Sequence, residues 1–341
     1  MIIIITIIII IIIIIIIIII ITIRLLTGHN HVFIDTEQYI AKFHKQRYCL
    51  LANSGWDLNY GMLACLPNSN NTTVIYDELS HNSLIMGIRS GRQDHTYNFK
   101  HNDIINLKEI LKNNNNINNE IIIAVEAVYS MDGDICPIKE ILDLAHEYNA
   151  MVVVDEAHSI GVIGSKGEGL VNALGLESHP NLLGVVYTYG KGLGFHGASL
   201  VTSHESLISY MLNYSRPLIY STSLPIPSVI TIQAAYEELF SEETSMKRKK
   251  LTMLIEHFQK EAIGLQLPAL KSSTPIQAIM VPSNERVLGL SSYLRQNNYC
   301  CLPIRAPTVP IGSERIRIIV HAHNSEKEIS DMCRLIKNFL Q

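Results

Sequence analysis

The stretch IIIAVEAVYSMDGDICPIKEILDLAHEYNAMVVVDEAH, residues 121–158, decides the fold. It opens with the apolar run 121–125 and closes with a second apolar run, 151–154. Short Val- and Ile-rich runs without a polar face are typical of parallel strands buried under helices. Between them, Pro137 precedes apolar residues at helical spacing, and proline suits the first turn of a helix. Strand, helix and strand form a βαβ unit, so the sequence predicts an α/β fold with a mainly parallel sheet.

Polar side chains follow each predicted strand directly. Glu126 follows the first run, Asp155 and His158 follow the second, and Lys191 comes after a third apolar run at 182–188. Ligands of parallel sheets bind beyond the carboxyl ends of the strands. The sequence therefore predicts a functional site where these four side chains meet.

The C-terminal part of the chain alternates helical stretches with short apolar runs, and this pattern predicts a smaller α+β domain. Its expected elements are a charged helical stretch at 236–262, strands at 276–281 and 315–320, and helices at 285–297 and 325–340. The expected organisation is a low-complexity tract at 1–23, a large ligand-binding domain at 24–234 and a small C-terminal domain at 235–341.

Residues 1–23 are Met1, twenty isoleucines and two threonines. This tract accounts for the positive mean hydropathy of +0.20, and the other residues average slightly below zero, which excludes a polytopic membrane protein. About 20 apolar residues can span a bilayer, so a membrane anchor stays open. The near-homopolymer composition favours a low-complexity leader instead. The Asn-rich run 113–119 predicts a hydrophilic loop.

Charge and cysteine content exclude further classes of protein. The 27 basic residues are balanced by 31 acidic ones and are dispersed, whereas nucleic-acid binders carry clustered positive charge. Six cysteines without C-x-x-C spacing indicate reduced thiols. We expect a cytoplasmic protein that binds no nucleic acid and meets a membrane only if residues 1–23 are an anchor.

Lys191 lies in the glycine-rich segment TYGKGLGFHG, 188–197, and has three interpretations. The first interpretation, a phosphate-binding P-loop, does not match the required pattern. Gly184 is one residue too far from Lys191, and Gly192 replaces the required Ser or Thr. A loop lysine without a role is the second interpretation. The third is a lysine that forms a Schiff base, with glycines that allow a cofactor to approach closely.

The sequence Asp155-Glu156-Ala157-His158 favours the third interpretation. A carboxylate at a buried strand end would keep a pyridine nitrogen protonated and make pyridoxal phosphate (PLP) an electron sink. A metal site at Asp155 and His158 lacks a convincing third ligand, so no metal is expected.

Six segments, taken together, resemble the α-oxoamine synthases, which are PLP-dependent enzymes of fold type I. The resemblance runs from about Arg24 to Gln341. The segments are DELSHNS (77–83), VYSMDGD (128–134), DEAH (155–158), TYGK (188–191), RPLIYSTSLP (216–225) and RAPTVP (305–310).

The resemblance assigns the catalytic groups. It implies that Lys191 binds PLP covalently and later removes the α-proton of the substrate. It further implies that Asp155 pairs with the pyridinium nitrogen, that His158 contacts the phenolic oxygen, and that His81 stacks on the ring.

The resemblance also assigns the binding groups. The cofactor phosphate is expected to meet the backbone N–H groups of Gly55 and Trp56 and the hydroxyl of Thr188. Ser221 or Thr222 is expected to reach across a dimer interface to the phosphate of the neighbouring subunit.

The substrate is expected to meet a further set of side chains. Glu126 is expected to line the substrate side of the site, and Ser130 is expected to line the site as a cofactor-binding residue. Arg305 matches the arginine that binds the amino-acid carboxylate, for which a guanidinium fork is suited, and Arg317 is the fallback.

The family joins an amino acid to an acyl-thioester with loss of carbon dioxide, so the resemblance implies an acyltransferase. The motifs are most similar to those of the biotin-synthesis branch. That branch condenses L-alanine with a pimeloyl thioester of CoA or acyl carrier protein to give 8-amino-7-oxononanoate. The implied partners are these two substrates and a second copy of the chain in a homodimer.

Three departures from that branch keep alternatives open. Ser159-Ile160 resembles the serine palmitoyltransferase branch, Asp57-Leu58 replaces the usual small residues, and the tract 1–23 stands where the family has an N-terminal segment. The alternatives are a synthase like serine palmitoyltransferase or 2-amino-3-ketobutyrate CoA ligase, or an N-terminally truncated, weakly active homologue.

Overall fold

The computed structural model describes residues 24, 28–67, 71–114 and 120–341. The interpretations of residues 1–23 and of most of the Asn-rich run therefore lie outside the described residues. Within the described part of the chain, no helix has the length and apolar content needed to cross a membrane. The chain forms two compact units, one of Met1–Ala127 with Pro137–Leu239 and one of Val128–Cys136 with Phe240–Gln341.

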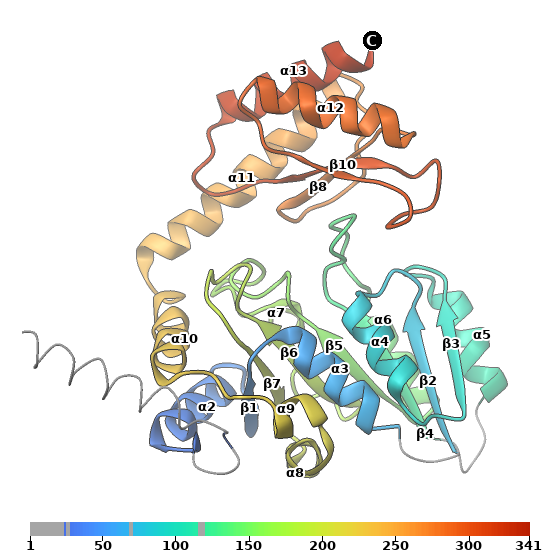
Figure 1. Cartoon of the computed structure of the whole chain (residues 1–341), viewed down its shortest axis with the longest axis vertical. Coiled ribbons are helices and arrows are strands. Elements are labelled where there is room, and N and C mark those ends of the chain that lie inside the picture. The colour runs from blue at the N-terminus through green and yellow to red at the C-terminus, as the bar shows by residue number, and fades with distance from the viewer. Residues whose placement is uncertain (1–23, 25–27, 68–70, 115–119) are drawn as a thin grey trace, which may run out of the picture. The chain divides into compact units, whose positions relative to one another are not determined.

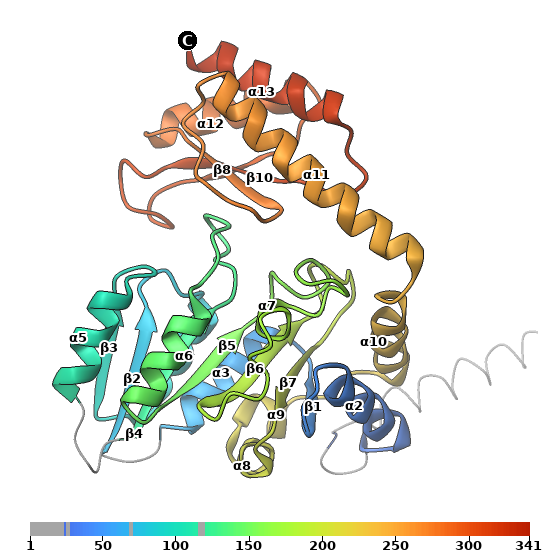
Figure 2. The same cartoon turned by 180° about the vertical axis from the view of Figure 1, so that it is seen from behind.

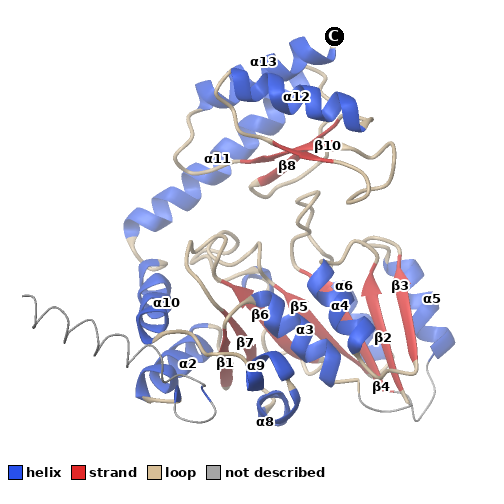
Figure 3. Ribbon diagram, viewed as in Figure 1, coloured by secondary structure: helices blue, strands red, loops and turns tan. Residues whose placement is uncertain are grey.

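The first unit is built on a seven-stranded sheet in the order β1-β7-β6-β5-β4-β2-β3 (Figures 1 and 3). Its strands are β1 (Tyr48–Ala52), β2 (Thr72–Asp77), β3 (His95–Phe99), β4 (Glu120–Glu126), β5 (Ala150–Asp155), β6 (Leu182–Thr188) and β7 (Ala198–Thr202). Every pairing from β6 through β3 is parallel, and β7 runs antiparallel to both of its neighbours. The predicted α/β class, with a mainly parallel sheet, is confirmed.

Helices cover both faces of this sheet (Figures 1 and 2). They are α2 (His31–Phe43), α3 (Gly55–Cys65), α4 (Asn82–Ser90), α5 (Ile104–Asn114), α6 (Ile138–Glu147), α7 (Leu170–Ala173), α8 (Glu205–Tyr214), α9 (Arg216–Tyr220) and α10 (Ile226–Glu238). On one face, Leu58 and Met62 of α3 share a hydrophobic core with Val153 of β5 and Val186 of β6. Successive strand residues point to opposite faces, so a strand between two helical layers must be apolar throughout.

The central βαβ unit forms as the sequence predicts. Pro137 is the N-cap of α6, one residue ahead of the expected first turn, and Ile138, Ile141 and Leu142 are buried. Strands β4 and β5 then pair in parallel, with Glu126 opposite Asp155.

The second unit has a three-stranded antiparallel sheet in the order β8-β10-β9 and three helices. Its elements are β8 (Ile276–Met280), β9 (Leu302–Ile304), β10 (Arg315–Ile319), α11 (Glu242–Gly264), α12 (Asn284–Gln296) and α13 (Glu326–Leu340). The loop 128–136 belongs to this unit, because Asp132 forms an ion pair with Arg315 and the Gly133 carbonyl accepts hydrogen bonds from Ser272 and Thr274.

The prediction of one charged helical stretch over 236–262 is wrong at its start. Helix α10 ends at Glu238, and α11 begins at Glu242 after the N-cap Ser241, whose side chain accepts a hydrogen bond from the Thr244 N–H. Since an N-cap serine has extended backbone, it separates two helices that charge and periodicity alone would merge.

A buried polar cluster joins α2, α10 and the carboxyl end of β6. His44 Nε2 lies 3.0 Å from the Tyr236 hydroxyl, and its Nδ1 lies 3.0 Å from Asn172 Oδ1. The His44 ring also stacks on Tyr187 at 3.9 Å. Burial lowers the pKa of His44 to about 3, so the ring stays neutral in the folded protein near neutral pH.

We expect this histidine to make the fold sensitive to acid. An unfolded His has a pKa near 6.5, so the folded state is favoured above that value and loses stability as pH falls towards the folded pKa of about 3. Between pH 7.5 and pH 5, the loss through His44 amounts to about 2 kcal/mol. The His44→Gln variant should lose less stability over this interval in urea unfolding. Exposed His95 is the control, and an equal change in His44→Gln and wild type would contradict the assignment.

Candidate active site

The carboxyl ends of β4, β5 and β6 bring the predicted polar groups to one edge of the sheet. Glu126 and Asp155 end adjacent strands in register. Asp155 is opposite Val186 of β6, two residues before Thr188. This proximity follows from parallel pairing, because the ends of parallel strands share one edge.

Asp155 is a buried carboxylate held by two donors. Its Oδ1 accepts a hydrogen bond from the Ala157 N–H at 2.9 Å, and its Oδ2 accepts one from Asn59 Nδ2 at 2.6 Å. Among the described residues it forms no ion pair, although the residue is only 5% exposed. A buried carboxylate without a cation is suited to bind a cationic N–H group.

Lys191 and His158 lie together, with 2.9 Å between Lys191 Nζ and His158 Nε2. Lys191 is in the loop after β6, which is closed by hydrogen bonds from Tyr189 N–H to the Gly197 carbonyl and from Phe195 N–H to the Tyr189 carbonyl. The lysine side chain is exposed, so it is accessible to a ligand.

His81 connects the first residues of α4 to the strand ends. Its backbone N–H donates to Glu126 Oε1, and its Nδ1 lies 2.8 Å from Ser83 Oγ. Its ring meets the Trp56 ring edge-on, with 6.1 Å between centroids. Burial lowers the pKa of His81, the charge of Asp155 raises it and that of Lys191 lowers it.

Glu126 is almost fully buried beside Asp155. Burial, and then the negative charge of Asp155, raise the pKa of Glu126 well above its usual range. The carboxyl group therefore keeps its proton to a higher pH than an exposed glutamate does.

The N-terminus of α3 lies against the end of β6. A Cβ atom on Gly55 would overlap the hydroxyl of Thr188. Ser54 caps the Asp57 N–H, and its carbonyl accepts from Leu58, which leaves the N–H groups of Gly55 and Trp56 without a partner among the described residues. Free N–H groups at a helix N-terminus favour an anion such as a phosphate.

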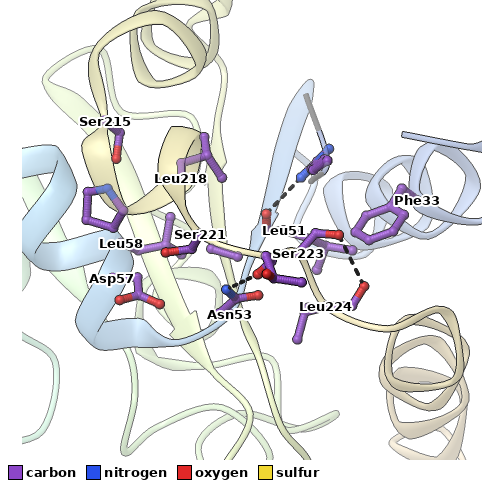
Figure 4. A pocket seen from close by; sticks show the side chains of 14 residues that line it. Phe33, Leu51, Asn53, Asp57, Leu58, Ser215, Leu218, Ser221, Ser223 and Leu224 are labelled. Atoms are coloured by element: carbon purple, nitrogen blue, oxygen red, sulfur yellow. Dashed lines mark hydrogen bonds between the residues drawn. The ribbon is translucent and has the colours of Figure 1, made fainter. Parts of the chain in front are cut away.

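Ser221 and Thr222 line a pocket beside α3 (Figure 4). The Thr222 carbonyl accepts a hydrogen bond of 2.6 Å from Asn53 Nδ2. The other lining residues include Asp57 of α3, Leu51 of β1 and Ser215 before α9. These two hydroxyl residues therefore neighbour the start of α3 within the first unit.

Two predicted residues, Ser130 and Arg305, belong to the second unit. The Ser130 carbonyl accepts a hydrogen bond of 2.7 Å from Nε of Arg317, the fallback arginine. The Arg305 side chain is exposed. The structure therefore places both residues in the second unit, whereas Lys191, His158 and Asp155 belong to the first.

Sequence reasoning missed Asn59, Ser83 and Glu156. Asn59 donates to both Asp155 and Ser83. Glu156 accepts hydrogen bonds from the backbone of Leu170 and Val171. Ser83 and Glu156 lie within the motif segments 77–83 and 155–158, which was the available signal, whereas Asn59 lies outside all six segments.

The assembled groups can do three things. The start of α3 with Thr188 can hold an anion, buried Asp155 can hold a cationic N–H, and Lys191 offers an amine beside an imidazole. These functions match an aromatic cofactor that carries a phosphate and a basic ring nitrogen, with an amine as covalent anchor and base.

Comparison with known proteins identifies the family. The family "Aminotransferase class I and II" matches residues 21–336. An 8-amino-7-oxononanoate synthase of Emericella nidulans is 35% identical over 337 residues, covering 93% of this chain and 80% of the relative.

Solved structures of two α-oxoamine synthases have a similar fold. Serine palmitoyltransferase from S. paucimobilis, with bound PLP-myriocin aldimine, has a TM-score of 0.85 at 26% identity, covering 93% of this chain and 78% of that chain. The 8-amino-7-oxononanoate synthase of Francisella tularensis has a TM-score of 0.78 at 24% identity, covering 91% and 88%, and shares the fold. The chain thus belongs to the aminotransferase class I and II family as an α-oxoamine synthase, a PLP-dependent acyltransferase.

Proposed function

We propose that this chain condenses L-alanine with a pimeloyl thioester and releases carbon dioxide to give 8-amino-7-oxononanoate. The observation that carries the reaction class is the grouping of Lys191, His158 and Asp155 at one sheet edge. The choice of substrates is supported by the 35% identity to a synthase of that name over 93% of the chain.

Two observations support a fit between the residues of the site and PLP. Gly55 has no room for a side chain beside the Thr188 hydroxyl, so backbone N–H groups and a hydroxyl are available to one phosphate. Buried Asp155 has two donors and a free capacity for a cationic ring N–H. When bound, PLP supplies an electron sink that acidifies the α-C–H bond of an amino acid.

In this proposal, Lys191 holds the cofactor through Nζ and then serves as the base. Its Nζ takes the α-proton of alanine, and His158 Nε2, 2.9 Å away, fixes the position of the amine. Asp155 would keep the ring nitrogen protonated, and His81 would cover the ring face. Ser221 or Thr222 would serve the phosphate of a second subunit in a homodimer.

The α-carbon of alanine forms a bond to the acyl carbonyl carbon, and the C–S bond breaks as the thiol leaves with a proton. The bond to the alanine carboxylate then breaks with release of carbon dioxide, and the α-carbon regains a proton. Arg305 is the residue we propose for binding the alanine carboxylate before it leaves.

A serine-dependent synthase is the second candidate. It is favoured by the TM-score of 0.85 to a serine palmitoyltransferase and by Ser159-Ile160, which resembles the serine palmitoyltransferase branch. The test is product formation from each pairing of alanine, serine or glycine with pimeloyl, palmitoyl or acetyl thioester. The proposal requires the fastest turnover with alanine and a pimeloyl thioester, and preference for serine with palmitoyl thioester would replace it by the second candidate.

Gly55→Ala should weaken PLP binding by about 10- to 100-fold, because the new Cβ displaces the Thr188 hydroxyl. The measurement is the dissociation constant from absorbance titration of PLP-free protein. Gly264→Ala is the matched control, since a Cβ there meets nothing within 4 Å. Equal affinities in Gly55→Ala and wild type would remove the α3 terminus from the phosphate site.

A further inference from the structure

Asn59 connects the buried Asp155 to a second catalytic-site residue. Its Nδ2 donates to Asp155 Oδ2 at 2.6 Å and to Ser83 Oγ at 3.1 Å. Ser83 Oγ in turn lies 2.8 Å from His81 Nδ1. The four side chains come from α3, β5, α4 and its N-cap, so one amide joins three elements.

The orientation of this amide follows from Asp155. Because an ionised carboxylate only accepts hydrogen bonds, the amide must present its NH₂ group to it. Asn59 is 1% exposed, and its Oδ1 is buried without a hydrogen-bond partner among the described residues. A buried carbonyl without a hydrogen-bond partner costs stability. The amide therefore keeps its hydrogen bond to the carboxylate although its own Oδ1 has no partner in the described part of the chain.

The backbone that carries Asn59 is held firmly. Leu58 and Met62 of α3 are in the hydrophobic core of the first unit. Helix α4 approaches closely at Gly87, where a Cβ would lie 3.0 Å from the Asn59 carbonyl. This close approach places Ser83 within reach of the Asn59 amide.

We propose that Asn59 is the positioning residue for Asp155: it fixes the plane of the carboxylate towards the cofactor ring and, through Ser83, ties that plane to the His81 ring. The inference rests on the proposed function, because only a bound cofactor makes the direction of the carboxylate matter.

The test compares Asn59→Leu, which removes the donor, with Asn59→Asp, which keeps the shape of the side chain but turns the donor into a carboxylate. Asn181→Leu is the matched control. Asn181 is also buried, at 7% exposure, and donates to the Ala150 carbonyl at 2.7 Å, at the opposite end of the strands. The readouts are the PLP dissociation constant, the α-proton exchange rate of L-alanine at saturating PLP, and the melting temperature of PLP-free protein.

We expect both Asn59 variants to bind PLP about 10- to 100-fold more weakly and to exchange the α-proton more slowly by a similar factor, as loss of a hydrogen bond to a charged group implies. Asn181→Leu should lower the melting temperature and leave both functional readouts within about twofold of wild type. If Asn59→Leu does not fold, the shape-preserving Asn59→Asp decides.

Wild-type PLP affinity and exchange rate in a folded Asn59 variant would overturn the inference and leave the proposed function standing. A wild-type protein that binds PLP but exchanges no α-proton would instead overturn the proposed function. In that case the PLP affinities of the Asn59 variants still decide the role of Asn59.

Discussion

Replacing Lys191 by alanine is expected to slow α-proton exchange of L-alanine by about 10⁴-fold, because in the proposed function Lys191 is both the anchor of the cofactor and the base. The measurement is deuterium incorporation into L-alanine followed by NMR at saturating PLP. Lys191→Arg should be equally slow, since a guanidinium keeps the positive charge but does not accept a proton at neutral pH.

The matched control is Lys139→Ala. Lys139 is an exposed lysine on α6 that pairs with Asp143, so its loss should leave the exchange rate unchanged. Exchange by Lys191→Ala at the wild-type rate would show that another group is the base, and the account of the site would be wrong.

The second large effect is expected at Asp155. Asp155→Asn keeps the shape of the side chain and removes its charge, so under the proposed role of Asp155 the ring nitrogen of the cofactor would lose the carboxylate that keeps it protonated. We expect exchange to slow by about 10²- to 10³-fold, which is the range for loss of one preorganised electrostatic contact.

Asp143→Asn is the control for Asp155→Asn, because Asp143 is an exposed carboxylate on the same unit. Asp143→Asn should keep the melting temperature of wild type, whereas Asp155→Asn should melt at a lower temperature, because its NH₂ group cannot accept one of the two hydrogen bonds that Asp155 accepts. If Asp155→Asn exchanges as fast as Asp143→Asn, the buried carboxylate has no electrostatic part in the reaction.

The fold class and the strand ends could be predicted from sequence, because buried parallel strands leave a local pattern. Runs without a polar face ending at Glu126 and Asp155 identify both the strands and their functional edge. The break between α10 and α11 was missed, since the stretch reads as helical on both sides of Ser241. Short β9 carries too few residues to form a recognisable pattern.

The contacts within the site could be predicted only in part. The motif around Lys191 places it near His158, but nothing local links Asn59 to Asp155, which are 96 positions apart. That contact depends on how α3 packs on the sheet. Ser159, a departure from the biotin-branch pattern, has a local role that the structure makes visible: its hydroxyl donates to the Glu156 carbonyl.

In the proposed function, Lys191 anchors PLP at this sheet edge. This role of Lys191 is tested most directly by incubating the purified protein with PLP, reducing it with borohydride and mapping the modified peptide by mass spectrometry. A single pyridoxyl adduct on Lys191 is expected, with none formed in Lys191→Ala. An adduct confined to other lysines, or no adduct, would contradict this role.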